Sequence, residues 1–281
     1  MAPIGTREEI VSAFDSFREE LDSNNDRRER IIKLSREITI LSKRAIFLLH
    51  RIATSDQKQE TPPYAGEGET QHAQSDSGDS VKTVETKLQD IRKRLLKQLA
   101  VEVPSQTIYW QHQVEIKSIT PGIQEYIEAV SYMHFIKTGR LIRYDEMKGW
   151  LSDHSGVLFV PLPFDEFLLG VSDLTGELMR FAITSIARGG GRTKAEDVCS
   201  FVRKCKADFE RFTPYVRELS KKQQTTKQSM QKIEEANYAV RLRLAEFQTD
   251  PDLLDEIAKR SIAIPQHRMR DEDNEEDPEM D

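Results

Sequence analysis

Apolar residues recur at helical spacing along most of this chain, and the longest pattern lies near the N-terminus. Intervals of three and four separate Ile31, Leu34, Ile38, Leu41, Ala45, Leu48 and Ile52. This heptad seam predicts a helix packed along its length against another helix, either within the chain or in an oligomer. An earlier stripe of Phe14, Phe17 and Leu21 is out of phase with the seam. We therefore expect a kink or stammer at residues 22–28 rather than a helix end.

The middle of the chain holds the most apolar helix. Residues 121–138 are apolar nearly all round, which predicts a buried helix that ends at Gly139. Thr120-Pro121-Gly122 has the form of an N-cap followed by proline at the first helical position, so this helix is expected to begin there. The preceding residues 105–119 fit both strand alternation and helical spacing, and their helical neighbours favour a helix.

Further helices are predicted towards the C-terminus. They cover residues 144–151, 165–187, a segment from 193, 213–247 and 252–259. Thr193 and Glu196 have the spacing of a capping box, and Thr213-Pro214 is expected to open the long helix. With the N-terminal helix and one that resumes at Val81, the chain holds about seven helices and no convincing sheet. This pattern predicts an all-α, single-domain bundle.

Composition divides the chain into structured and unstructured stretches. Residues 55–80 contain no Leu, Ile, Val, Met, Phe or Trp, which predicts a disordered insertion. The acidic tail at 263–281 is expected to be disordered for the same reason. The predicted helical domain therefore consists of residues 1–54, its first long helix, and residues 81–262, the remainder.

Charge is distributed unevenly along the chain. Residues 267–281 hold eight acids and two arginines, so most of the formal net charge of −7 lies in the tail. Residues 26–51 carry eight Lys or Arg against three acids. Such a basic stripe is compatible with phosphate contacts, although a solvated helix face is the commoner explanation.

Several classes of protein are disfavoured by the sequence. No run approaches eighteen apolar residues and the N-terminus has no apolar signal region, so neither a membrane span nor a secretory signal is expected. Cys199 and Cys205 fit neither a zinc pair nor a disulfide framework, which favours reduced thiols in the cytosol or nucleus. The motifs of P-loop, dinucleotide-binding, zincin and serine-hydrolase enzymes do not occur.

Two acidic pairs lie in the apolar helices and are the candidate chemistry. Glu125 and Glu128 are three residues apart, and Asp173 and Glu177 are four apart, so each pair shares one helix face. Four carboxylates between two buried helices repel one another unless they are protonated or neutralised by a cation. An oxygen-only donor set favours Mg²⁺, with Mn²⁺ as the alternative, and water bound to such an ion can attack a phosphodiester. The spacing does not fix one ion or two.

Other residues near these acids have simpler explanations. Gly170 and Gly176 lie on either side of Asp173, and glycine in a helix costs about 1 kcal/mol relative to alanine. We expect them to let a second helix or a substrate approach the carboxylates. Tyr132 lies one turn from Glu128, where a core role is commoner than a hydrogen bond to the acid.

Five blocks of sequence carry a resemblance to a known family. They are KLSREIT (33–39), SKRAIFLLHRI (42–52), GIQEYIEAVS (122–131), HFIKT (134–138) and LLGVSDLTGELMR (168–180). These blocks closely resemble the translin family, in its translin-associated factor X group. The resemblance extends over residues 14–245.

The resemblance implies both a fold and a function. It implies a seven-helix bundle that assembles with translin into a hollow, roughly octameric shell, in which the X subunit is a Mg²⁺-dependent endoribonuclease. The implied substrate is single-stranded RNA, with single-stranded DNA as a further ligand, and the implied roles are passenger-strand removal in RNA silencing and processing of transfer-RNA precursor fragments in the cytoplasm and nucleus. The family's catalytic acids fall on Glu125, Glu128 and Asp173, with Glu177 as an associated metal ligand. The alternative is a non-catalytic scaffold that binds nucleic acid and partners translin.

Overall fold

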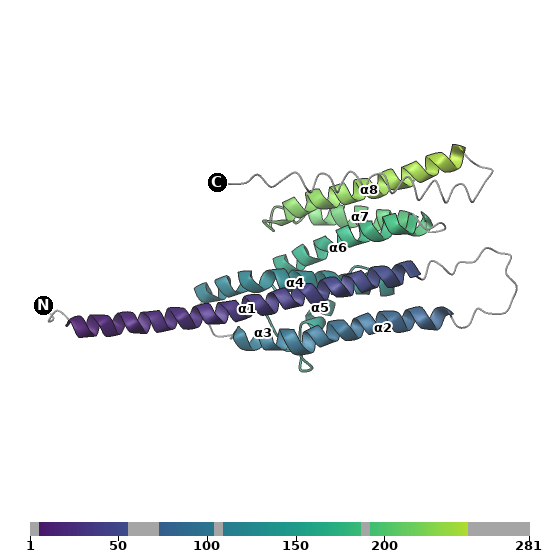
Figure 1. Ribbon diagram of the computed structural model, residues 1–281. Coiled ribbons are helices and arrows are strands. Elements are labelled where there is room, and N and C mark those ends of the chain that lie inside the picture. Colours follow the sequence, from purple (N-terminus) through teal and green to yellow (C-terminus); the bar gives the residue numbers. More distant parts are fainter. Residues whose placement is uncertain (1–5, 56–72, 104–108, 187–191, 247–281) are drawn as a thin grey trace, which may run out of the picture.

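The computed structural model describes residues 6–55, 73–103, 109–186 and 192–246, which form long helices lying side by side (Figure 1). The elements are α1 (Arg7–Ser55), α2 (Ala73–Ile91), the π-helical turn η2 (Arg92–Leu96), α3 (Lys97–Glu102), α4 (Tyr109–Thr138), α5 (Tyr144–Trp150), α6 (Phe164–Ile186), α7 (Arg192–Glu210) and α8 (Leu219–Glu246). Since α2, η2 and α3 follow one another without a break, they form one helix. The described residues thus make seven helices and no strand, which confirms the all-α bundle.

Helix α1 has two parts with different surroundings. Its heptad seam packs against α4 within the chain, with Ile31, Ile38 and Ala45 almost fully buried. Before the seam, α1 continues without interruption past the body of the bundle (Figure 1). There Phe14 and Leu21 are 67% and 69% exposed. The seam is therefore intramolecular, and the phase change at residues 22–28 is not accompanied by a helix end.

Helix α2 begins earlier than the sequence predicted. It starts at Ala73, inside the stretch 55–80 that was expected to be disordered. Local contacts occur in the part of α2 that follows. The Asp79 side chain accepts a hydrogen bond from Lys82, and the Asp79 carbonyl accepts one from Thr83. The prediction is therefore wrong for residues 73–80, and residues 56–72 lie outside the described part.

Helix α4 also differs from the prediction. It runs without a break from Tyr109, so Pro121 lies inside the helix and the N-cap expected at Thr120 does not form. Contacts with α1 accompany the continuous course. The Ser35 hydroxyl donates to the Ile119 carbonyl and accepts from the Gly122 N–H at 3.2 Å, while a Cβ on Gly122 would lie only 2.7 Å from the Ser35 carbonyl oxygen. Tertiary packing therefore outweighs the local proline signal.

The ends of the later helices are close to those predicted, with two corrections. Gly139 ends α4 in the left-handed conformation, φ 67°, as expected. Thr193 lies inside α7 instead of capping it, because the helix begins at Arg192. The long helix α8 begins at Leu219 and not at Thr213, because residues 211–218 form successive tight turns. Residues 187–191 and the predicted helix 252–259 lie outside the described part.

Two further expectations bear on the class of protein. Both Cys199 and Cys205 are free thiols. Among the described helices, none has the length and apolar content that a bilayer crossing requires.

Candidate active site

Close packing of α4 against α6 brings the two acidic pairs together. At Gly170 a Cβ would lie 2.9 Å from the Cβ of Ile127, so this glycine permits the approach of α4. At Gly176 a Cβ would meet nothing within 4 Å. The expected reason for the glycines is therefore confirmed at Gly170, where the neighbour is a helix, while Gly176 leaves open space.

The α4 carboxylates are poorly compensated by the rest of the chain. Burial and the charges of Asp173, Glu125 and Glu177 raise the pKa of Glu128 to about 9. Burial also raises the pKa of Glu125, against the opposing charge of Lys43, whose ammonium lies 3.7 Å away and is 65% exposed. Glu128 is therefore protonated at neutral pH when no further cation is present.

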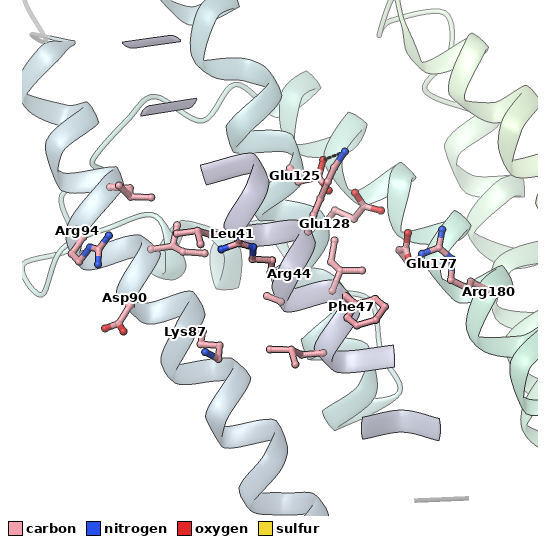
Figure 2. A pocket seen from close by; sticks show the side chains of 16 residues that line it. Leu41, Arg44, Phe47, Lys87, Asp90, Arg94, Glu125, Glu128, Glu177 and Arg180 are labelled. Carbon is pink, nitrogen blue, oxygen red and sulfur yellow. Dashed lines mark ion pairs between the residues drawn. The ribbon is translucent and has the colours of Figure 1, made fainter. Parts of the chain in front are cut away.

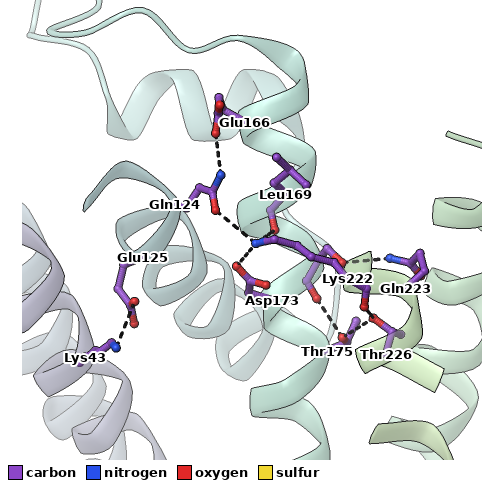
Figure 3. A network of polar contacts seen from close by, with 11 residues as sticks. Lys43, Gln124, Glu125, Glu166, Leu169, Asp173, Thr175, Lys222, Gln223 and Thr226 are labelled. Atoms are coloured by element: carbon purple, nitrogen blue, oxygen red, sulfur yellow. Dashed lines mark hydrogen bonds and ion pairs between the residues drawn. The ribbon is translucent and has the colours of Figure 1, made fainter. Parts of the chain in front are cut away.

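Asp173 is held by a lysine from a distant part of the chain. The ammonium of Lys222, on α8, donates to Asp173 Oδ2 and also, at 3.2 Å each, to Gln124 Oε1 and the Leu169 carbonyl (Figure 3). Gln124 in turn donates to Glu166 at 2.6 Å. Burial raises the pKa of Asp173, and the hydrogen bond and charge of Lys222 oppose this. Three helices thus meet at the Lys222 ammonium.

Glu177 has its own partners. One carboxylate oxygen contacts His50 Nε2, on α1, and lies 3.6 Å from the Arg180 guanidinium. The other ring nitrogen of His50 lies 3.0 Å from the Tyr132 hydroxyl. Burial raises the pKa of Glu177, but the hydrogen bond from His50 and the charges of Arg180 and His50 outweigh it and leave the pKa lowered. Tyr132 therefore hydrogen-bonds to His50, and Arg180 pairs with Glu177, three residues before it on α6.

A cavity of about 960 Å³ opens beside these acids, between α1, α2, η2, α4 and α6 (Figure 2). Glu125, Glu128 and Glu177 line it, whereas Asp173 is not among its lining residues. The lining also holds five basic residues and a fourth acid: Lys43, Arg44, Lys87, Arg94, Arg180 and Asp90. Lys43 lies beside Glu125 and Arg180 beside Glu177, so acids and cations adjoin each other around the cavity.

The four acids fit a hard divalent cation by chemistry and charge. All their donors are carboxylate oxygens, which Mg²⁺ prefers, and a cation would oppose the burial and the neighbouring negative charges that raise the pKa of Glu128. They do not form a ready cage, because no three His, Cys, Asp or Glu side chains of the described ranges are placed to hold one ion. Lys222 and His50 instead occupy oxygens of Asp173 and Glu177.

Comparison with known proteins gives the family. The model of the translin family matches residues 26–244, which is most of the chain. The chain belongs to the translin family. Translin-associated protein X of Rattus norvegicus is 37% identical over 260 residues, covering 85% of this chain and 80% of the relative. The homologous protein of Schizosaccharomyces pombe is 30% identical over 237 residues, covering 83% of this chain and 89% of the relative.

Solved structures agree on the translin-family fold. AfC3PO matches with a TM-score of 0.57 and 19% identity, covering 82% of this chain and 98% of that one. The apo form of NeC3PO matches with a TM-score of 0.55 and 17% identity, covering 79% and 94%. At these identities the likeness establishes the fold of the bundle. Any statement about chemistry has to be argued from the residues of the site.

Sequence reasoning found the acids of this translin-family chain but missed their partners. Lys222 lies in a polar run of α8 with no distinguishing pattern, and its role depends on how α8 packs against α6. His50 did have a signal, because it follows Leu48 and Leu49 next to the buried seam and is itself half-buried. A polar ring on that edge of the seam needs a partner.

Proposed function

We propose that this chain is the catalytic subunit of a translin-type complex, a Mg²⁺-dependent endoribonuclease that cleaves single-stranded RNA. In this proposal Glu125, Glu128 and Asp173 are the catalytic, metal-holding residues and Glu177 is an associated ligand. The observation that carries it is the gathering of four acidic side chains, whose burial and mutual charge raise the pKa of Glu128, beside a cavity that also holds five basic residues. Acids are rarely buried without a compensating charge. The repulsion between these acids therefore favours a bound cation that offsets it.

Each part of the site has a task under this proposal. Mg²⁺ or Mn²⁺, when bound, supplies a water of lowered pKa and stabilises a leaving oxygen. Glu125 and Glu128 offer oxygens from α4 and Asp173 from α6, while Lys222 orients the Asp173 carboxylate. The basic residues that line the cavity attract the phosphates of the substrate.

The proposed partner is translin, in a hetero-octameric shell. The names of the relatives, which describe a translin-associated protein, support this. So does the exposed apolar stripe at the start of α1, where Phe14 and Phe17 pack edge to face with a ring separation of 5.8 Å while more than half of each is exposed. Large exposed apolar groups in a row are typical of an interaction surface. The fold neighbour AfC3PO was also solved with duplex RNA, which makes RNA the first ligand to test.

Cleavage by the complex tests the proposal. The chain would be co-expressed with translin and given labelled single-stranded RNA with Mg²⁺ or with EDTA. Wild type is expected to cut only with the metal, and Asp173→Asn is expected to cut at least 100-fold more slowly, on the scale of losing a catalytic charge. Asp208→Asn, an exposed acid on α7, serves as the matched control and should cut like wild type. Cutting by Asp173→Asn at the wild-type rate would move the chemistry elsewhere.

A second candidate function is a nucleic-acid-binding scaffold without catalysis. The observation in its favour is that Lys222 and His50 already engage Asp173 and Glu177, and the described residues hold no ready metal cage. A complex that binds single-stranded RNA but does not cut it at any Mg²⁺ or Mn²⁺ concentration would select the scaffold.

A further inference from the structure

One aromatic residue that lines the cavity has no role in the proposed catalysis. Phe47, on α1, is 62% exposed, although its neighbours Ile46 and Leu49 are 5% and 0% exposed. It lines the cavity together with the carboxylates (Figure 2). A large aromatic ring that α1 presents to a polar cavity contributes little to the core, because most of its surface stays in water.

Cationic side chains precede this ring on α1 and line other parts of the same cavity. Lys43 and Arg44 lie one helical turn before Phe47 on the same side of α1. Lys87 and Arg94 approach from α2 and η2 and line the same cavity, where both are exposed. Phe47 therefore combines an accessible aromatic face with several positive charges.

We propose that Phe47 is a stacking platform for a base of single-stranded RNA, while Lys43, Arg44 and Arg94 hold the neighbouring phosphates. Proteins that bind single-stranded nucleic acid combine these two features, a positively charged groove and aromatic faces on which bases stack. The cavity volume of about 960 Å³ lies at the upper end of the range for small-ligand sites and leaves room for a nucleotide unit. This inference rests on the proposed function and names the residues that would hold its substrate beside the acids.

Charge favours RNA over a protein partner at this place. The other exposed aromatic residues of α1, Phe14 and Phe17, lie in a segment with five acids and two arginines between residues 7 and 21. Phe47 instead lines a cavity with five basic residues against four acids, and three of those acids are carboxylates of the proposed metal site. The surroundings of Phe47 therefore favour phosphate more than those of Phe14 and Phe17 do.

RNA binding in EDTA separates this inference from catalysis. The full chain, co-purified with translin, would be titrated with a single-stranded RNA that carries 2-aminopurine, and with an abasic strand of equal length and charge. Phe47→Leu keeps an apolar side chain and removes the aromatic face. It is expected to weaken binding of the base-containing strand about 5- to 100-fold, the range for one stacked base, and to reduce the quenching of 2-aminopurine. Binding of the abasic strand should not change.

Two control variants make the result specific. Tyr215→Leu removes an exposed ring that does not line the cavity and should bind both strands like wild type. Arg44→Met should weaken both strands alike and lower the salt dependence by about one phosphate contact. Equal binding of the base-containing strand by Phe47→Leu and wild type would overturn the inference, as would loss of translin from the purified Phe47→Leu complex. If Phe47→Leu weakens binding as expected but the wild-type complex does not cut RNA, the proposed nuclease activity is rejected and the stacking role of Phe47 is retained.

Discussion

The acids of α4 and those of α6 face each other but differ in the partners that the rest of the chain supplies to them. Asp173 and Glu177, on α6, each have a close partner in Lys222 or His50. On α4, Glu125 has a looser contact with exposed Lys43, 3.7 Å away, and the charge of Lys222 only partly offsets the burial and neighbouring acids that raise the pKa of Glu128. The chain therefore supplies close cationic or hydrogen-bonding partners to one half of the site and compensates the other half less. A metal ion has most to contribute on the α4 side.

The largest expected effect concerns Glu128 in metal-free protein. Its folded pKa of about 9 lies above the usual value, so the folded state keeps a proton that the unfolded state has lost. Stability should be full below pH ~4.5 and fall by up to about 1.4 kcal/mol per pH unit as pH rises towards 9. Glu128→Gln should flatten this dependence and raise stability at pH 8 by about 2 kcal/mol or more. Denaturant unfolding in EDTA at several pH values measures it.

Glu177→Gln provides the opposite case. Because the pKa of Glu177 is lowered, its ionised form stabilises the fold above the unfolded pKa, and this contribution is lost as pH falls. The variant should therefore be less stable than wild type at neutral pH, whereas Glu128→Gln should be more stable. Changes of the same sign in both variants would show that the two halves of the site are not distinct.

The next effect tests the α8 lysine. Lys222→Met removes the ammonium that joins Asp173, Gln124 and the Leu169 carbonyl, and should lower the free energy of unfolding by about 2 kcal/mol, typical for hydrogen bonds to a charged group. Lys221→Met, the exposed neighbour, should stay within about 0.5 kcal/mol of wild type. Thermal unfolding of both variants gives the comparison. An equal loss of stability in both would contradict a specific stabilising role for the Lys222 contacts.

The distance between α4 and α6 is tested by the two glycines. Gly170→Ala places a methyl group against Ile127 and should destabilise the fold by about 1 to 2 kcal/mol through overpacking. Gly176→Ala meets open space and should stabilise it by up to about 1 kcal/mol through helix propensity. Differential scanning calorimetry distinguishes these signs, and stabilisation in both variants would mean that α4 and α6 have room to separate.

Local periodicity was enough to predict the helices and the acidic pairs, but not their surroundings. The apolar helix that ends at Gly139 and the faces that carry Glu125 and Asp173 depend on neighbours three or four residues away. The continuous course of α4 through Pro121 depends instead on Ser35, 86 residues earlier in the chain. Likewise, Lys222 reaches Asp173 only because α8 packs on α6. Contacts of this kind have no local sequence signal.

The smallest expected effect is the response to Mg²⁺ itself, and it decides whether the ion depends on Glu177 as it does on the α4 acids. An ion that binds only the folded state stabilises it by about 1.4 kcal/mol at ten times its dissociation constant. The double variant Glu125→Gln and Glu128→Gln should lose this gain, whereas Glu177→Gln should keep most of it, since His50 already satisfies Glu177. Thermal shift with and without Mg²⁺ measures the gain without relying on RNA cleavage. A complete loss in Glu177→Gln would contradict the comparison. The ion would then depend on Glu177 as much as on the α4 acids, and His50, as its competitor for Glu177, would have to release that carboxylate when the ion binds.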